Sequence, residues 1–398
     1  MNVKKKALNL VLVSIASIIS FPLIIILTPL KYLFKIQFVR VKNSRMGPLA
    51  GTEIFFRQLK MGKIKNETKY IGIANTKIAN QQFFKMLQRQ MKIISFPQPK
   101  LIRIIFLKLA TNPRLNKWGL LKELKYIGHE YEELNEVSNC IQFTEEEEKL
   151  GQKLLKEMKI PLNTKFICFY ARDKAYLDNL LKKRDHRHDF RNSDINQFLK
   201  SVEFITQKGE YAFRMGAKVE KEICTSNEKI IDYASRYRSD FLDIYLSSHC
   251  KMFLANSSGL IVVPHVFNIP VASVNVIPLP FGIPPGKNDL FIPKKIWSIK
   301  KNRLLSFREM IYSHELEYWQ TNEFRKEDNL IPIENTSEEI LDLTKEMYER
   351  LEGTWITTHE NEVMQLKFKS LFELNSNYAH FPSRIGTKFL IENKYLLD

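Results

Sequence analysis

The sequence predicts an α/β protein with two parallel-sheet domains in tandem behind an N-terminal membrane anchor. Three observations support this prediction: short apolar runs alternate with amphipathic stretches in both halves, polar loops follow several of those runs, and the first residues are basic and apolar. Alternating strand and helix patterns are typical of βαβ units, which build parallel sheets. We therefore predict an anchor at 1–36, domains at 37–155 and 156–320, and a C-terminal helical region at 321–398.

Length, composition and charge narrow the class of protein. A chain of 398 residues is long enough for two domains, and 44% hydrophobic with 26% charged residues is normal for a folded protein, which excludes disordered, collagen-like and multi-span membrane proteins. The net charge of +17 indicates an anionic partner. Eight basic residues and no acidic one lie within residues 1–45, which favours a membrane surface over nucleic acid. Four widely spaced cysteines indicate reduced thiols and a cytoplasmic protein.

The N-terminal apolar segment is predicted to be a retained anchor. Residues 7–30 carry no charge, and roughly 20 apolar residues suffice to span a bilayer. The stretch is longer than the core of a signal peptide, and no cleavage pattern follows it. Pro22 and Pro29 predict a kink, and both flanks are basic, so the orientation is left open. A single span and a re-entrant anchor both fit, and a buried helix of a soluble domain is the alternative.

Strands and helices are expected in the following order. In the first domain, strands are predicted at 36–41, 69–75 and 92–96, with helices at 52–61 and 78–91 and mostly helix from 97 to 160. In the second, strands are predicted at 163–173, 210–216, 251–255 and 271–276, with helices at 195–209, 240–250 and 260–268 and a loop at 278–286. Terminal helices are expected at 337–351 and 359–373. Ligands of such sheets bind outside the carboxyl ends of the strands, so candidate residues are sought there.

The first candidate is the loop Asn256-Ser257-Ser258-Gly259, between a predicted strand and a short helix. Backbone N–H groups at the start of a helix favour a phosphate, and the serine hydroxyls add donors. The alternative is an ordinary helix cap in a tight turn.

Arginines follow two other predicted strands. Arg172 and Asp173 come after FICFY, and Arg214 comes at the end of 210–216. Because parallel strands share one carboxyl edge, both guanidinium groups are expected near the serine loop, where they can grip a diphosphate bidentately. A surface ion pair is the alternative interpretation of each.

Two polar loops supply candidates for the catalytic base. The stretch 182–192 contains His188, Asp189 and Arg191, and the loop predicted at 45–53 ends in Glu53. Asp189, Glu53 or His188 suits a general base, and Arg191 suits a phosphate ligand. His-x-His beside Asp lacks an evident third metal ligand, so no metal is expected. The sequence contains no P-loop, GxGxxG, HExxH or GxSxG motif.

In order along the chain, these motifs resemble a family of glycosyltransferases from bacterial O-antigen and capsule gene clusters. The matching segments are 45–57, 166–178, 188–195, 213–216, 232–260, 291–295 and 383–397, of which 232–260 is the most specific. The resemblance implies a GT-B-like fold of two Rossmann-like domains, with the acceptor on the first and a nucleotide-sugar donor on the second. It implies no metal and no cofactor other than the nucleotide sugar. The arginine-bearing segment also looks like that of certain fucosyltransferases, and the serine loop like that of same-fold epimerases.

The expected function is therefore transfer of a sugar to a lipid-linked or surface-polysaccharide acceptor at the cytoplasmic face of the membrane. Arg172, Asp173, Arg191, Arg214 and the serine loop would bind the donor. One departure from the family concerns the first loop, where Pro48 stands in place of the histidine of Gly-His-Leu. It favours the alternative of a non-catalytic nucleotide-binding assembly factor. A sugar-nucleotide epimerase or a pyruvyl-type transferase is the same-fold alternative.

Overall fold

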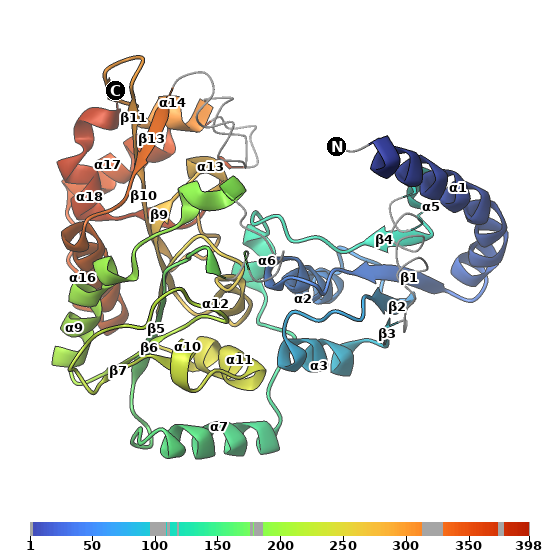
Figure 1. Ribbon diagram of the computed structural model, residues 1–398, viewed down its shortest axis with the longest axis horizontal. Coiled ribbons are helices and arrows are strands. Elements are labelled where there is room, and N and C mark those ends of the chain that lie inside the picture. The colour runs from blue at the N-terminus through green and yellow to red at the C-terminus, as the bar shows by residue number, and fades with distance from the viewer. Residues whose placement is uncertain are drawn as a thin grey trace. The chain divides into compact units, whose positions relative to one another are not determined.

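The chain divides into two compact units. The computed structural model describes residues 3–95, 109, 112–117, 119–175, 178, 186–312, 329–372 and 378–397. The first unit comprises Met1–Ile127 and Glu136–Phe143, and the second comprises Gly128–Asn135 and Thr144–Asp398 (Figure 1). The chain therefore passes between the units three times, after residues 127, 135 and 143. The boundary was expected near residue 155, and the C-terminal helices belong to the second unit.

The first unit contains a four-stranded parallel sheet with strand order β3-β2-β1-β4. Its strands are β1 (Ile36–Val41), β2 (Lys69–Ala74), β3 (Ile93–Ser95) and β4 (Leu121–Glu123). The helices α3 (Gln81–Gln90) and α5 (Pro113–Lys117) also belong to it. The first three strands lie where the alternation of residues predicts them. The strand β4 was missed because its three residues lie in a stretch read as helix.

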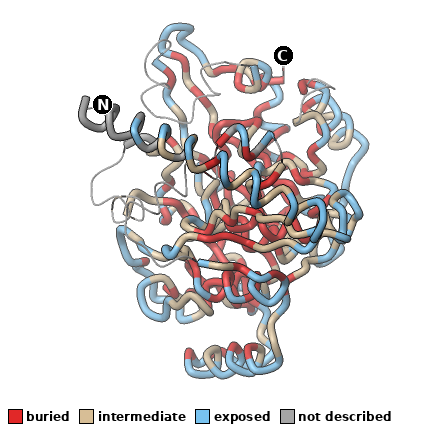
Figure 2. Tube along the Cα trace, turned by 90° about the vertical axis from the view of Figure 1, so that its right-hand side faces the viewer, coloured by how far each residue is buried: buried red, intermediate tan, exposed pale blue. Residues whose placement is uncertain are grey.

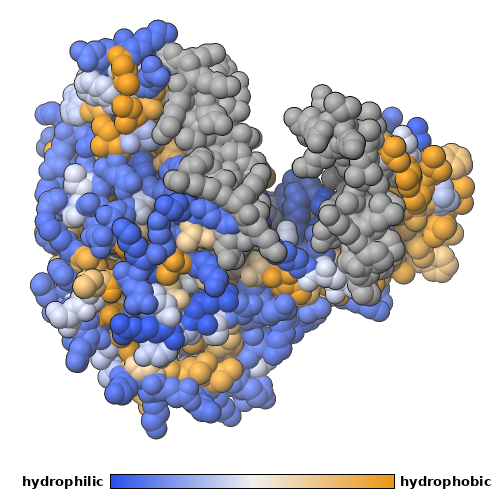
Figure 3. All heavy atoms as spheres, in the orientation of Figure 1, coloured by the Kyte–Doolittle hydropathy of each residue, from blue (hydrophilic) through white to orange (hydrophobic). Residues whose placement is uncertain are grey.

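The N-terminal segment forms one helix, α1 (Val3–Tyr32). One of its faces packs on the first unit, where Ile19, Leu23, Ile24 and Leu27 contact Leu109, Leu115 and Leu120. Its other face exposes large apolar side chains, among them Ile18 at 72% and Phe21 at 66% (Figure 3). Within the described part of the chain, no helix is both long and apolar enough to cross a membrane. The predicted anchor is thus not confirmed as a span.

The helix α2 (Met46–Lys60) replaces the loop expected at 45–51. Pro48 lies in its first turn, where a missing N–H group does no harm because the first helical N–H groups have no partner within the helix. Gly51 packs closely against the backbone of Lys125, since a Cβ at residue 51 would lie 2.6 Å from the Lys125 carbonyl carbon. The proline and the glycine that suggested a loop therefore serve helix initiation and close packing.

The second unit contains a seven-stranded parallel sheet with strand order β14-β10-β9-β8-β5-β6-β7. Its strands are β5 (Phe166–Tyr170), β6 (Tyr211–Arg214), β7 (Ile230–Ile231), β8 (Phe253–Asn256), β9 (Val271–Val276), β10 (Leu290–Pro293) and β14 (Arg384–Ile385). Read from β7 to β10 and numbered along the chain, the order is 3-2-1-4-5-6, which is that of the Rossmann fold. The strand order reverses between β5 and β8.

Helices cover both faces of this sheet, as in other Rossmann-like domains. The helices α9 (Leu199–Gln207) and α16 (Ser337–Glu352) lie on one face, and α11 (Asp240–His249) and α12 (Val262–Val266) lie on the other (Figure 1). The sheet between them is the most deeply buried part of the unit (Figure 2).

Smaller elements complete the second unit. The helices are α6 (Tyr131–Glu136), α7 (Glu145–Glu157), η1 (His186–Arg191), η2 (Ile195–Phe198), α10 (Tyr233–Arg236), α13 (Leu279–Gly282), α14 (Phe307–Tyr312), α17 (His359–Lys369), α18 (Thr387–Glu392) and η4 (Lys394–Leu397). A three-stranded antiparallel sheet contains β11 (Lys295–Ser298), β12 (Arg303–Leu304) and β13 (Leu330–Ile333).

Candidate functional site

Loops from several strands meet at the carboxyl edge of the second unit's sheet, beside the point where strand order reverses. Asn256, the last residue of β8, is fully buried and joins the end of β8 to the connection between β5 and β6. Its side-chain oxygen accepts the backbone N–H of Arg172 at 2.8 Å, and its side-chain nitrogen donates to the Arg191 carbonyl at 2.8 Å and to Ser193 at 3.0 Å. Asn256 begins the NSSG loop, but only Ser257, Ser258 and Gly259 of that loop were predicted to bind a ligand.

Two of the predicted arginines lie in this site, and each donates hydrogen bonds to neutral oxygens. Arg172 is buried, and its guanidinium donates to the His188 carbonyl at 3.1 Å and to the side-chain oxygen of Asn192. Arg191 donates to the Ser257 carbonyl at 2.9 Å, and its Nε is buried without a hydrogen-bond partner among the described residues. The Ser257 carbonyl satisfies one N–H group of Arg191 without neutralising its positive charge.

A third cation, Lys294, was missed by the sequence analysis. It follows β10, is 2% exposed, and donates from Nζ to the Asn192 carbonyl at 2.8 Å. The carboxylate of Glu334 lies 3.7 Å from the same Nζ. Burial lowers the pKa of Lys294, Glu334 opposes that change, and the nearby charge of Arg172 adds to it. Only the pairing of β10 with β9 brings this lysine to the site.

The electrostatics of the cluster reflect like charges held close together. Burial and then the charge of Arg172 lower the pKa of Arg191 to about 10. Burial also raises the pKa of Tyr170 to about 12, and Asp173 adds to that rise while the nearby arginines oppose it. Because like charges repel in a poorly solvated site, the arrangement favours an anion bound among Arg172, Arg191 and Lys294.

The serine loop differs in part from its prediction. The helix α12 begins at Val262, three residues after Gly259, and has only five residues. So short a helix adds little dipole, because the macrodipole is the sum of its aligned peptide units. Ser257 contributes its carbonyl to Arg191, and Gly259 is exposed. Ser258 Oγ is buried with no hydrogen-bond partner in the described parts of the chain, so it remains available to a ligand.

Two predicted donor ligands are engaged within the protein. Arg214 is 1% exposed, forms an ion pair with Asp232 at 3.1 Å and donates to the Lys221 carbonyl at 3.2 Å. Its charge is thus already neutralised, contrary to the prediction that it faces a diphosphate. Asp173 accepts the backbone N–H groups of Ala175 and Glu220, each at 2.9 Å. Both residues therefore shape the loops around the site.

Two of the three candidate bases lie near the cations. His188 and Asp189 belong to η1 and are half-buried. The His188 carbonyl accepts from Arg172, and a carboxylate oxygen of Asp189 accepts from the Asn192 side chain at 3.3 Å. Both candidates are therefore tied to the same loop as Arg172 and Asn192.

The third candidate base, Glu53, lies in the first unit inside α2 rather than in a loop. It is fully buried, pairs with Arg57 Nε at 2.8 Å and accepts the backbone N–H of Cys140 at 2.9 Å. Burial raises its pKa, and Arg57 opposes that rise. Glu53 therefore presents no surface to a substrate, which corrects its assignment as a base.

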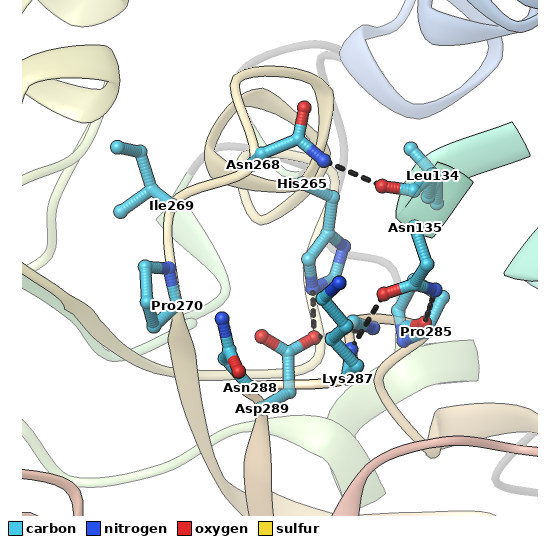
Figure 4. A pocket seen from close by; sticks show the side chains of 11 residues that line it. Leu134, Asn135, His265, Asn268, Ile269, Pro270, Pro285, Lys287, Asn288 and Asp289 are labelled. Carbon is cyan, nitrogen blue, oxygen red and sulfur yellow. Dashed lines mark hydrogen bonds and ion pairs between the residues drawn. The ribbon is translucent and has the colours of Figure 1, made fainter. Parts of the chain in front are cut away.

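Metal coordination and an enclosed cavity are two further ways in which a protein holds a ligand. Among the described residues, no group of three or more His, Cys, Asp or Glu side chains is placed to hold a metal ion. A cavity of about 80 Å³ lies at the opposite, amino edge of the sheet, lined in part by His265 and Asp289 (Figure 4). The Asp289 carboxylate accepts the backbone N–H groups of Val271 at 2.8 Å and Gly286 at 2.7 Å. Its Oδ2 also lies 3.3 Å from His265 Nε2. These contacts hold strand ends together.

Comparisons with known proteins find remote structural likeness only. No family model matches the chain, and no curated protein matches it. A family 9 glycosyl transferase from Veillonella parvula has 10% identity and a TM-score of 0.40, covering 65% of this chain and 86% of that one. ADP-heptose lipopolysaccharide heptosyltransferase II of E. coli has 13% identity and a TM-score of 0.40, covering 64% and 90%. The iron-containing dodecameric glycosyltransferase TibC of enterotoxigenic E. coli has 10% identity and a TM-score of 0.33, covering 61% and 59%. At these TM-scores the likeness carries no argument about activity.

Proposed function

We propose that the protein is a glycosyltransferase whose second unit binds a nucleotide-sugar donor, with the donor's diphosphate at Arg172, Arg191 and Ser258. The observation that supports this proposal is the group of three cations that donate to backbone carbonyls at the reversal of strand order. Ligands of Rossmann-type sheets bind at that point, and charged hydrogen bonds to phosphate are the strong ones. The cations would neutralise the diphosphate without a metal ion.

The reaction has one bond-making and one bond-breaking event. An acceptor hydroxyl oxygen attacks the anomeric carbon of the donor, and the bond from that carbon to the diphosphate oxygen breaks. The electron pair leaves with the diphosphate, and the hydroxyl proton passes to a base. Asp189 is the proposed base, with His188 as the alternative, because both lie on η1 beside the cations. The cations stabilise the charge that develops on the leaving group.

The acceptor is proposed to be a lipid-linked or surface-polysaccharide glycan, bound by the first unit at the cytoplasmic face of the membrane. The exposed apolar face of α1, which includes Ile18 and Phe21, supports membrane association. Further exposed apolar side chains follow at the end of the helix and just after it, at Tyr32, Leu33 and Phe34. Burying each such side chain in lipid gains about 1.5–3 kcal/mol. Since the other face packs on the first unit, we favour a helix lying in the membrane surface over a span.

Flotation of the full-length protein with anionic vesicles tests the membrane proposal. The Ile18→Glu, Ile25→Glu double variant should stay with the unbound protein. The matched control, Ile356→Glu with Leu366→Glu, changes two exposed apolar residues of the second unit and should float as the wild type does. Equal flotation of both variants would contradict the proposal.

Nucleotide binding and product analysis test the enzymatic proposal. The full-length protein is titrated with UDP, GDP, dTDP, ADP and CMP, with and without EDTA, and then incubated with nucleotide sugars and membrane extract. We expect binding that EDTA does not change and a glycosylated lipid product. An epimerase would convert the donor with no acceptor present. Binding without any turnover would favour the assembly factor, although Pro48 now has a structural explanation in the first turn of α2.

A further inference from the structure

The cavity at the amino edge of the second unit's sheet contains a buried histidine with an unsatisfied ring nitrogen. The cavity has a volume of about 80 Å³, and all of its lining residues belong to the second unit. The side chain of His265, on α12, is 5% exposed and turns Nε2 toward Asp289 (Figure 4). Its other ring nitrogen, Nδ1, is buried without a hydrogen-bond partner among the described residues. An unsatisfied buried polar atom costs free energy, so a ligand that pairs with Nδ1 would stabilise the protein.

Asp289, the acidic residue of the lining, already has partners within the protein. Its two carboxylate oxygens accept the two backbone N–H groups described above, and Nε2 of His265 lies 3.3 Å from Oδ2. When the imidazole carries both of its protons, Nε2–H faces this carboxylate and Nδ1–H is a donor. An anion at Nδ1 would select that form, because a negative charge then lies at each nitrogen of the imidazolium.

Two exposed residues of the lining add donors for the same kind of ligand. The side chains of Lys287 and Asn288 line the cavity, and neither has a partner within the described part of the chain. The backbone N–H of Lys287 donates to the side-chain oxygen of Asn135 at 2.7 Å, which anchors the lysine at the cavity. With His265 protonated, two positive charges face the one negative charge of Asp289. A singly charged anion therefore balances the lining, and charged donors form their strongest hydrogen bonds with such an acceptor.

The volume of the cavity limits the size of the ligand. One water-sized group needs roughly 10–15 Å³ of such space, so the cavity holds roughly five to eight non-hydrogen atoms. Inorganic phosphate and small carboxylates are within that size, and a nucleotide sugar far exceeds it. We propose that the cavity binds a small oxyanion, a phosphate or a carboxylate, through Nδ1 of His265, Nζ of Lys287 and the Asn288 amide. The site lies at the edge opposite the cations of the donor site, so this proposal does not rest on glycosyl transfer.

Equilibrium dialysis of the full-length protein against radiolabelled inorganic phosphate, and separately against radiolabelled acetate, tests the site. We expect saturable binding, and the more tightly bound probe distinguishes a phosphate ligand from a carboxylate. Lys287→Glu reverses the charge at an exposed position, where folding is not at stake, and should weaken binding about tenfold. Lys156→Glu, at an exposed lysine of α7 away from the cavity, is the matched control and should change nothing. His265→Phe keeps a planar ring without a donor and should also weaken binding about tenfold.

A second background separates this cavity from the cations at the carboxyl edge, which also attract phosphate. Arg172→Met removes one of those cations, so binding at the cavity should persist in this variant and should still respond to Lys287→Glu. If the wild type binds neither probe, the proposal is overturned. Binding that responds to Arg172→Met but not to Lys287→Glu also overturns it, and in that case the carboxyl-edge site stands. Should His265→Phe fold poorly, Lys287→Glu decides the outcome by itself.

Discussion

Both units bury charged side chains beside their parallel sheets, but they treat those charges in opposite ways. In the first unit, Glu53 and Arg57 neutralise one another, and their remaining hydrogen bonds reach the Cys140 N–H and the Val137 carbonyl. In the second, Arg172, Arg191 and Lys294 each donate to a backbone carbonyl, and Glu334 lies 3.7 Å from Lys294. The first arrangement closes on itself and ties residues 136–143 to α2. The second brings three like charges together, and the proposed anionic donor would offset their repulsion.

The largest expected effect comes from breaking the neutral pair. Glu53→Gln leaves Arg57 buried without its counter-charge and should lower the free energy of unfolding by about 3–5 kcal/mol. Urea denaturation of the full-length protein measures this loss. Glu67→Gln, which removes an exposed partner of Lys35, is the control and should change stability by less than about 1 kcal/mol. Equal effects of the two variants would refute the structural role of Glu53.

Replacing the carboxylate of Asp189, next to the cations, should reduce activity rather than stability. The Asp189 carboxylate is half-buried and accepts from the Asn192 side chain at 3.3 Å, and an asparagine amide oxygen can accept the same hydrogen bond, so Asp189→Asn should change stability much less than Glu53→Gln does. Loss of a general base should reduce the turnover number about 100-fold while nucleotide affinity is kept. Single-turnover transfer assays measure the rate. Full activity in this variant, with loss in His188→Gln, would move the role of base to the histidine.

Removing a cation from the second cluster sharpens the comparison. Arg172→Met should weaken nucleotide binding about 30-fold, through loss of charged hydrogen bonds to phosphate. Stability should not fall by the amount seen for Glu53, because repulsion of Arg191 is relieved at the same time. Calorimetric titration and thermal unfolding give the two quantities. Arg303→Met, at an exposed ion pair with Glu309, should alter neither.

Salt should affect the two clusters unequally, and this is the smallest effect. Raising sodium chloride from 50 to 500 mM should weaken nucleotide affinity roughly threefold, because part of the attraction between ligand and cations is screened. The fully buried Glu53–Arg57 pair should keep its contribution, since solvent ions do not reach it. Titrations and denaturation curves at both salt concentrations test this, and equal salt sensitivity would contradict it.

Parts of the fold could be predicted because local pattern decides them. The strands β1 and β9 match their predicted residues, since three of the six residues in each are valine or isoleucine, which favour strands. The strands β7 and β14 have only two residues each, too few to give a pattern. The start of α2 was missed because Pro48 and two glycines resemble a loop. The helix predicted at 52–61 already contained Glu53 and Arg57, and their i,i+4 spacing indicates the pairing that their assignment overlooked.

Residues of the candidate site could be predicted only where they lie in a polar segment that follows a recognisable strand along the chain. Arg172 and Arg191 were predicted as donor ligands because they stand in polar segments after β5, and the structure places both near Asn256. Lys294 was not, because its membership depends on which strand β10 pairs with. Arg214 was placed in the site wrongly, because sequence does not show that Asp232 lies opposite it. Partners distant along the chain decide these cases, and local pattern does not contain them.

The triple passage of the chain between the units limits how this protein can be dissected. A fragment that starts at Thr144 lacks Gly128–Asn135, and with it the hydrogen bonds of Asn135 to the Pro285 carbonyl at 2.9 Å and the Lys287 N–H at 2.7 Å. A fragment that ends at Ile127 lacks the Val137 carbonyl that accepts from Arg57 and the Cys140 N–H group that donates to Glu53. Neither unit is a continuous module, so exchanging the first unit for that of another protein means transplanting two separate stretches of chain at once.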